Sequence, residues 1–285
     1  HGLIQDESGN PLDHIKMRNK KYCECEPCRE AKTRRPSHKT ITERDTTNLG
    51  LCGFVVSDLT KILPVTDEGY QFCGHFTFVK MRYTSVFFLS HKDQVAGKWA
   101  DTITEMESLG YDIKLMICRT DSGGEYGAKF DKLCKGKGIV HQYTAPYQHE
   151  QNAYAEVIWR ILGDSARAMH LASGLEPKYW PYFYSQAALI RNIIPNKQIN
   201  MKQPHAMRYG YPFNPKHLQI MGQTGYVHIP KEKHDNSGKH PRRGKLDAAA
   251  IKMIYLGHNL RASTYIMMNP ADGKIGVSFT EPNFV

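Results

Sequence analysis

The chain has 285 residues, enough for one large domain or two small ones with a sizeable core. A mean hydropathy of -0.53 and the lack of any apolar run near the roughly 18 residues that span a bilayer exclude a membrane-spanning protein, and no signal peptide is visible. Lysine and arginine number 38 against 28 acidic residues, and the net charge of +10 points to an anionic partner. Seven cysteines, an odd number, favour a reducing intracellular setting over a disulfide framework. Because the first residue is His, we expect a fragment of a longer protein.

The first 48 residues are polar and lack periodicity. From residue 51 the pattern changes to apolar and aromatic runs that predict strands, separated by stretches with apolar residues three and four apart that predict helices. In chain order we expect strands over 51–58, 70–79 and 84–90, a helix over 94–109, a strand over 113–120, a short helix over 129–134 and a strand over 139–144. Helices over 152–171 and 177–192 complete this region.

After residue 203 the helical periodicity ends, and short strands are expected over 225–229, 251–257, 264–268 and 275–280. Such a set indicates a small barrel. Between the first two strands lies a basic stretch that is either an ordinary solvated linker or a phosphate contact. Its cationic side chains include Lys231, Lys233, Arg242, Arg243 and Lys245. Nucleic acid is favoured over a membrane as partner, because these residues do not lie on an amphipathic helix.

Three carboxylates stand at the ends of predicted elements. Asp58 closes the first strand, Asp121 follows the strand over 113–120 and opens a Ser-Gly-Gly-Glu turn, and Glu156 stands near the start of a helix. An Asp at a strand end is often only a turn residue, so the set carries the argument and no single member does. Oxygen-only ligands suit Mg²⁺ or Mn²⁺, and two such ions can clamp the attacking and leaving oxygens of a phosphoryl transfer. The sequence therefore predicts a two-metal site.

The order of these elements, with acids on the first strand, the fourth strand and a late helix, resembles the ribonuclease-H-like fold. More closely, nearly the whole chain resembles the integrases of copia-type long-terminal-repeat retrotransposons. The motifs that carry this resemblance include Ser57-Asp58-Leu59, Thr120-Asp121-Ser-Gly-Gly-Glu-Tyr126, His141-Gln142, Gln151-Asn152-x-x-Ala155-Glu156 and Tyr255-Leu256-Gly257. The resemblance implies an α/β fold: a ribonuclease-H-like mixed sheet flanked by helices over 49–210. A truncated zinc-binding segment over 1–48 would precede it, and a small SH3-like β domain over 211–285 would follow.

In such integrases three acids bind two divalent ions, usually Mg²⁺, and the enzyme cuts a donor DNA end and joins its 3′-hydroxyl to target DNA. The resemblance implies that Asp58 bridges the two ions while Asp121 and Glu156 each hold one. It also implies DNA contacts from Asn152, Arg160 and Arg167, for which a helix cap and two surface arginines are the plain alternative. The implied partners are element ends, target DNA and further copies of the chain, and the implied location is the nucleus.

Cys25 and Cys28 supply half of a tetrahedral Zn²⁺ site. In the family the two histidine ligands come from an upstream helix, so the resemblance implies that the Zn²⁺ site is incomplete in this chain. The chain also departs from the family pattern at Lys80, His149 and Ala153, and its interval between Asp121 and Glu156 is one residue short.

Two other functions stay open beside the integrase. One is a decayed or co-opted copy that binds nucleic acid without catalysis. The departures from the family pattern favour this alternative, whereas the presence of all three acids favours the enzyme. The other is a ribonuclease H that hydrolyses RNA–DNA hybrids, and the strand-rich basic C-terminal region and the cysteine pair weigh against it.

Overall fold

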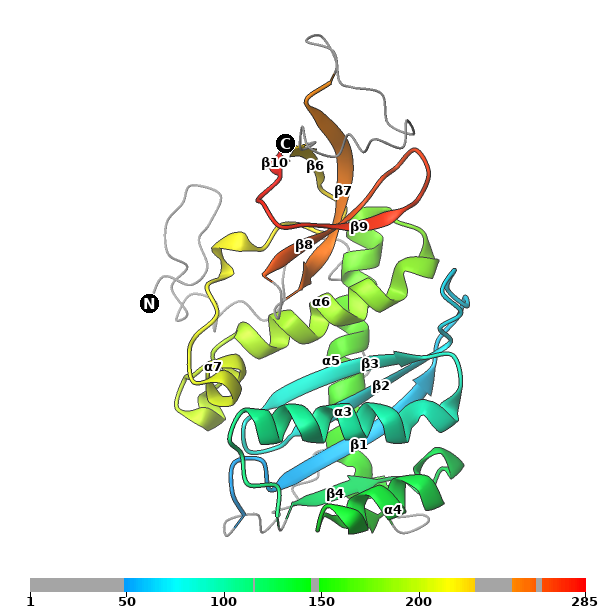
Figure 1. Cartoon of the computed structure of the whole chain (residues 1–285), viewed down its shortest axis with the longest axis vertical. Helices are drawn as coiled ribbons and strands as arrows, with labels where there is room; N and C mark the ends of the chain where they lie inside the picture. Colours follow the sequence, from blue (N-terminus) through cyan, green and yellow to red (C-terminus); the bar gives the residue numbers. More distant parts are fainter. Residues whose placement is uncertain (1–48, 115, 145–148, 229–247, 260–262) are drawn as a thin grey trace, which may run out of the picture. The chain divides into compact units, whose positions relative to one another are not determined.

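The structure is a computed structural model that describes residues 49–114, 116–144, 149–228, 248–259 and 263–285 (Figure 1). The described chain falls into two compact units. The first runs to Ala168 and resumes over Glu176–Pro215, and the second comprises Met169–Leu175 and Lys216–Val285. The expected zinc-binding segment with Cys25 and Cys28 lies outside the described residues, as does the basic stretch with Lys231, Lys233, Arg242, Arg243 and Lys245.

The first unit is built on a five-stranded sheet in the order β3-β2-β1-β4-β5. The strands are β1 (Phe54–Lys61), β2 (Phe72–Phe78), β3 (Tyr83–Leu89), β4 (Ile117–Thr120) and β5 (Val140–Tyr143). β1, β2 and β3 pair antiparallel, whereas β4 runs parallel to β1 and β5 runs parallel to β4. This mixed sheet has the ribonuclease-H-like arrangement, and the fold class predicted for this region is confirmed.

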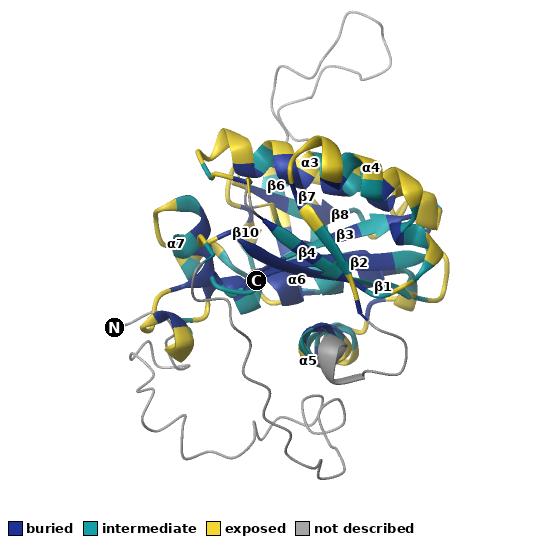
Figure 2. Cartoon of the chain, turned by 90° about the horizontal axis from the view of Figure 1, so that it is seen from below, coloured by how far each residue is buried: buried dark blue, intermediate teal, exposed yellow. Residues whose placement is uncertain are grey.

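Helices cover both faces of this sheet. α3 (Val95–Ser108) and α4 (Ala128–Gly136) lie on one face, while α5 (His149–Ser173) and α6 (Trp180–Ile193) lie on the other, as Figure 2 shows. The remaining elements of this unit are α7 (Pro204–Tyr209) and single 3₁₀ turns, η1 (Lys92–Gln94), η2 (Gly124–Tyr126), η3 (Pro177–Tyr179) and η4 (Lys197–Ile199). Every helix and strand expected between residues 51 and 192 is present, but two strands have wrong boundaries. β1 was expected over 51–58 and runs over Phe54–Lys61, so Asp58 lies within the strand and does not close it.

The largest boundary error is the start of the fourth strand, which was expected at 113 and lies at Ile117. Asp112 caps the preceding turn by accepting the Lys114 N–H at 2.9 Å, and the Met116 N–H donates to the Ile113 carbonyl. The apolar run continues through this turn because Ile113 and Met116 are buried in the core. The apolar residues between 113 and 116 therefore reflect burial in the core, and they do not form part of a strand.

Aromatic side chains fill the layer between the sheet and α3. Trp99 is fully buried, with its ring centroid 4.8 Å from that of Phe76 on β2 and 5.9 Å from that of Phe130 on α4. The predicted spacing along α3 is confirmed, because Trp99, Ile103 and Met106 are all buried on one side of the helix. This layer ties α3 and α4 to the strands that carry the candidate site.

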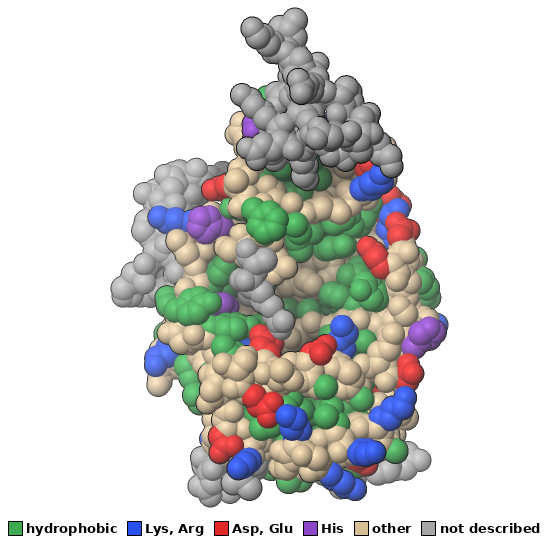
Figure 3. All heavy atoms as spheres, in the orientation of Figure 1, with side chains coloured by type: hydrophobic (Ala, Val, Ile, Leu, Met, Phe, Trp, Pro, Cys, Tyr) green, Lys and Arg blue, Asp and Glu red, His purple; other side chains and the backbone are tan. Residues whose placement is uncertain are grey.

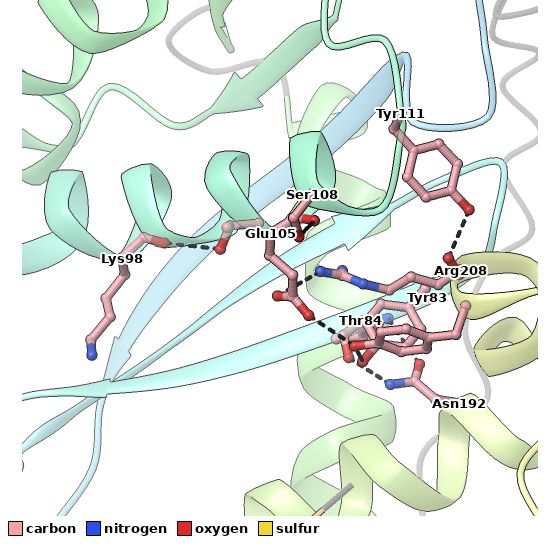
Figure 4. Close-up of polar contacts among 10 residues, drawn as sticks. Tyr83, Thr84, Lys98, Glu105, Ser108, Tyr111, Asn192 and Arg208 are labelled. Carbon is pink, nitrogen blue, oxygen red and sulfur yellow. Dashed lines mark hydrogen bonds and ion pairs between the residues drawn. The ribbon is translucent and has the colours of Figure 1, made fainter. Parts of the chain in front are cut away.

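An ion pair between α7 and α3 is buried in the described part of this unit (Figure 4). Arg208 on α7, whose side chain is 1% exposed, contacts Glu105 on α3 at 2.8 Å. Its guanidinium lies over the Phe78 and Tyr83 rings, 5.1 and 4.5 Å from their centroids, and the Tyr209 hydroxyl donates to Glu105 at 3.0 Å. α7 is therefore held to α3 and to the β2–β3 hairpin by one compensated buried charge.

The second unit contains an antiparallel sheet in the order β10-β6-β7-β8-β9. It follows η5 (Pro215–His217), and its strands are β6 (Thr224–His228), β7 (Ala250–Asn259), β8 (Thr264–Met268), β9 (Ile275–Ser278) and β10 (Asn283–Phe284). Tyr255, Tyr265 and Met267 form its core. The four strands expected here are confirmed, and β10 was not anticipated. The SH3-like assignment and the boundaries at 48 and 210 stay predictions.

The buried pair yields a test with a control on the same helix. Glu105→Gln leaves the Arg208 guanidinium buried without a carboxylate and should lower the free energy of unfolding by about 3–5 kcal/mol. Glu107→Gln breaks the Lys137–Glu107 pair, whose two side chains are each 39% exposed. It should cost less than about 1 kcal/mol. Urea denaturation of the two variants measures both, and equal losses would contradict a special role for Arg208.

Candidate functional site

Asp58 lies inside β1, where its backbone pairs with His75 on β2. Its carboxylate is partly buried and both oxygens are engaged. Oδ1 accepts the Leu59 N–H at 2.8 Å, and Oδ2 accepts the Trp159 indole N–H from α5 at 3.1 Å. The side chain therefore points toward the face of the sheet that α5 covers.

Asp121 immediately follows β4, the parallel neighbour of β1. Val56 pairs with Arg119, so Asp58 and Asp121, each two residues further along its strand, lie at the same level of the sheet. Oδ1 of Asp121 accepts the Gly123 N–H at 3.0 Å, which closes a turn that ends the strand. Parallel pairing thus brings together two carboxylates that are far apart in the sequence.

Glu125 is a third carboxylate at this place, and the sequence analysis gave it no role. A Cβ atom built on Gly123 would lie 2.7 Å from the Glu125 carboxylate carbon and 3.0 Å from Asp121 Oδ1. Glu125 is 7% exposed and pairs with Lys92 at 3.2 Å. A side chain at position 123 would therefore push the Glu125 carboxylate, and to a lesser degree that of Asp121, from the positions they occupy here. The available signal was the acid in the Ser-Gly-Gly-Glu turn itself.

Burial and like charge act together on Asp58. The pKa of Asp58 is raised to about 6, mainly by burial and in addition by the negative charges of Asp121 and Glu125. Hydrogen bonds from the Leu59 N–H and from Trp159 oppose the rise. A hard cation beside these oxygens would relieve the repulsion, so the donor set fits Mg²⁺ or Mn²⁺ in its chemistry.

Glu156 is exposed on α5, three residues before Trp159. Across the part of the chain that the structure describes, no three His, Cys, Asp or Glu side chains are gathered closely enough to hold a metal ion. The structure therefore brings Asp58 and Asp121 together but does not complete the set with Glu156. The three-ligand site stays a prediction, and it requires Glu156 to approach the two aspartates.

Trp159 is the second residue that the sequence analysis missed. Besides its hydrogen bond to Asp58, its ring meets the His75 ring edge-on at 5.0 Å and the Tyr184 ring at 6.2 Å. His75 is fully buried, and burial lowers its pKa to about 3, so it is neutral. Trp159 thus fixes α5 against β1 and β2. Its position one turn after Glu156 on the same side of the helix was the available signal.

The predicted DNA contacts lie along α5 as far as the structure describes them. Arg160 and Arg167 are exposed, and Arg167 forms an i,i+3 pair with Asp164 at 3.5 Å. Asn152 belongs to α5, but its side chain lies outside the described residues. On the opposite face, over α3 and α4, basic and acidic side chains are mixed in the described part, as Figure 3 shows. Contact of the α5 face with DNA stays a prediction.

Comparison with known proteins points to one kind of relative. The chain is 27% identical over 259 residues to the retrovirus-related Pol polyprotein from transposon TNT 1-94 of Nicotiana tabacum. The matched region covers 88% of the chain and 18% of the polyprotein. It is 25% identical over 233 residues to that from transposon RE2 of Arabidopsis thaliana, covering 79% of the chain and 15% of the polyprotein. The chain is a homologue of part of these transposon Pol polyproteins. It spans less than a fifth of their length.

No family model matches the chain. Among solved structures, the catalytic core domain of BIV integrase is similar with a TM-score of 0.40 and 15% identity over 56% of this chain and 95% of that one. A chain of the simian T-cell lymphotropic virus intasome in complex with PP2A regulatory subunit B56 gamma is similar with a TM-score of 0.46 and 14% identity. The match covers 92% of this chain and 87% of that one. In the described chain, no helix has the length and apolar character that crossing a membrane requires.

The raised pKa of Asp58 predicts how the stability of the fold depends on pH. The pKa of Asp58 is about 6 in the fold against 3.8 as the reference. Without divalent ions, stability should therefore fall by roughly 2 kcal/mol as pH rises through this window. Asp58→Asn should remove most of that fall, and Mg²⁺ should raise the melting temperature of the unaltered chain but not of this variant. Thermal unfolding across pH checks this, with the exposed Asp101→Asn as control.

The glycine turn allows a matched pair of variants. Gly123→Ala should weaken Mg²⁺ binding by about tenfold or more, because the new methyl group would displace the Asp121 and Glu125 carboxylates. Gly124→Ala has open space at its Cβ and should bind Mg²⁺ like the unaltered chain. Calorimetric titration with Mg²⁺ compares them. Equal affinities would mean that the Gly123 turn does not shape the site.

Proposed function

We propose that this chain is the integrase portion of a copia-type long-terminal-repeat retrotransposon Pol polyprotein, which processes the 3′ ends of element DNA and joins them to target DNA. The observation that carries the proposal is the placement of Asp58 and Asp121 at one level of neighbouring parallel strands. The homology to transposon Pol polyproteins supports it. Because the chain spans only part of those relatives, their other activities are not assigned to it.

The proposed chemistry needs no covalent protein intermediate. The nucleophile is water in the first step and a DNA 3′-hydroxyl in the second. The described cysteines do not suit the role of a nucleophile, because each is buried and burial raises the pKa of each thiol. They are Cys52, Cys73, Cys118 and Cys134. A phosphoryl transfer without a protein nucleophile is thus the consistent choice.

Asp58, Asp121 and Glu156 are the proposed holders of two divalent ions, Mg²⁺ or Mn²⁺. Such ions supply activation of the attacking oxygen and stabilisation of the leaving oxygen. The chain's own residues shape the place: Trp159 orients the Asp58 carboxylate, and Lys92 restrains Glu125 beside Asp121. α5 is fixed at Trp159, so a shift of its first turns is the proposed route by which Glu156 reaches the aspartates.

The proposed partners are DNA and further copies of the chain, acting in the nucleus. The +10 net charge supports a polyanionic partner. Asn152, Arg160 and Arg167 on α5 and the basic stretch around Lys231 and Lys245 are proposed contacts. Zn²⁺ at Cys25 and Cys28 is proposed only as a partial site, since two cysteines supply half of its ligands.

The second candidate is an integrase-derived protein that binds nucleic acid without catalysis. It is favoured by one observation: in the described chain Asp58, Asp121 and Glu156 do not form a group that could hold a metal ion. In that case Asp58 and Asp121 would be remnants, and Mg²⁺ would bind weakly or not at all. The basic surface would still bind DNA.

A strand-transfer assay with a labelled DNA end and Mg²⁺ or Mn²⁺ separates the two candidates. The unaltered chain should yield joined product, and Asp121→Asn and Glu156→Gln should each lower the rate at least about 100-fold because each removes a metal ligand. Asp101→Asn on α3 serves as the charge-matched control and should be fully active. DNA binding without any joined product would overturn the catalytic proposal and favour the second candidate.

A further inference from the structure

Two arginines and a tyrosine meet beside α5, outside the carboxylate site. Arg82 lies in the β2–β3 hairpin with φ of 60° and donates through Nη1 to the Tyr154 hydroxyl at 2.9 Å. Arg191 on α6 donates through Nη1 to the Arg82 carbonyl at 2.5 Å. The Arg82 guanidinium lies over the Tyr154 ring, 5.5 Å from its centroid. Three elements thus converge on one cationic cluster, which we define as Arg82, Arg191 and Tyr154.

Among the residues that the structure describes, no carboxylate compensates the charge of this cluster. In the described chain neither Arg82 nor Arg191 forms an ion pair, and the buried Nε of Arg191 has no hydrogen-bond partner there. Burial lowers the pKa of Arg191, and the charge of Arg82 lowers it as well. Arg208 is the contrast within the same unit, because Glu105 contacts it at 2.8 Å. Two neighbouring guanidinium groups without a carboxylate favour a bound anion.

The alternative is that Tyr154 alone satisfies both arginines and that no anion binds there. Its hydroxyl accepts from Arg82 and interacts with Arg191. A neutral phenol, however, satisfies hydrogen bonds without cancelling either positive charge, and two like charges held together remain repulsive. A phosphate group offers several acceptor oxygens together with negative charge, which suits two planar guanidinium groups. Arg82 and Arg191 are both partly exposed, so such a group can reach them.

We propose that Arg82 and Arg191 form a phosphate-binding site beside the first turns of α5, and that its ligand is a phosphodiester of a nucleic-acid backbone. Tyr154 stands two residues before Glu156, so the site would anchor a DNA strand next to the helix that carries the proposed third metal ligand. The inference rests on the proposed function for the identity of the ligand. The phosphate chemistry itself does not depend on catalysis.

Two binding measurements in EDTA test the site without any metal. In the first, millimolar inorganic phosphate should raise the melting temperature of the unaltered chain more than chloride of equal ionic strength. Arg191→Gln should abolish this rise, and Arg191→Lys should retain part of it because the charge remains. Tyr154→Phe should retain the rise, which separates the anion site from a structural role of the phenol.

In the second measurement, fluorescence anisotropy follows a short DNA duplex at several salt concentrations. Arg82→Gln and Arg191→Gln should each weaken binding about tenfold and reduce the salt slope by about 1, the signature of one lost phosphate contact. Lys132→Gln, an exposed cation on α4 at the opposite face of the sheet, should bind like the unaltered chain. Circular dichroism of each variant verifies that it is folded.

The outcomes separate the sources of the phosphate. Loss of both the phosphate effect and DNA affinity in Arg191→Gln supports a nucleic-acid backbone site. Loss of the phosphate effect alone overturns the backbone assignment and assigns free phosphate as the ligand. No phosphate effect on the unaltered chain, or an undiminished phosphate effect in Arg191→Gln, overturns the site. If the variants behave as expected while no strand transfer occurs, the catalytic proposal fails and the phosphate site stands.

Discussion

The parallel pairing of β1 with β4 is the constraint on which the candidate site depends. Its register puts Asp58 and Asp121 at one level, although 62 residues separate them in the sequence, and the glycine turn after β4 admits Glu125 beside them. Burial of the Asp58 carboxylate and the nearby like charges are both unfavourable for its ionised form, and together they raise its pKa, burial most of all. Packing of Trp99, Phe76 and Phe130 behind the sheet holds the strands in this arrangement.

The two faces of the sheet carry different kinds of side-chain contact. The α3 and α4 face carries the aromatic core and, at its far end, the Glu105–Arg208 pair, which stabilises the position of α7. The α5 face carries Trp159, which links the helix to Asp58, and the cluster of Arg82, Arg191 and Tyr154. Buried positive charge is thus compensated by a carboxylate near α3, whereas the described residues supply none to the arginines near α5. That difference supports the proposal that the α5 face binds an anionic partner.

The elements of the first unit could be predicted because each combines local periodicity with clear ends, as on α3, where Trp99, Ile103 and Met106 recur on the buried side. The start of β4 could not, since buried apolar residues in a turn resemble a strand when only the sequence is read. The missed residues, Glu125 and Trp159, act through partners distant in sequence, Lys92 and Asp58. No local pattern marks such pairs.

The sequence by itself determined the fold class, the order of elements and the aspartates at the ends of two apolar runs, because these depend on local patterning. Only the tertiary structure decided which carboxylates meet, since that depends on strand register and on side-chain space at Gly123. It also decided that the Trp159 indole donates to the Asp58 carboxylate, and that among the described residues Asp58, Asp121 and Glu156 do not form a group that could hold a metal ion. Hydrogen bonds and charge across distant segments set those distances, and a linear sequence does not contain them.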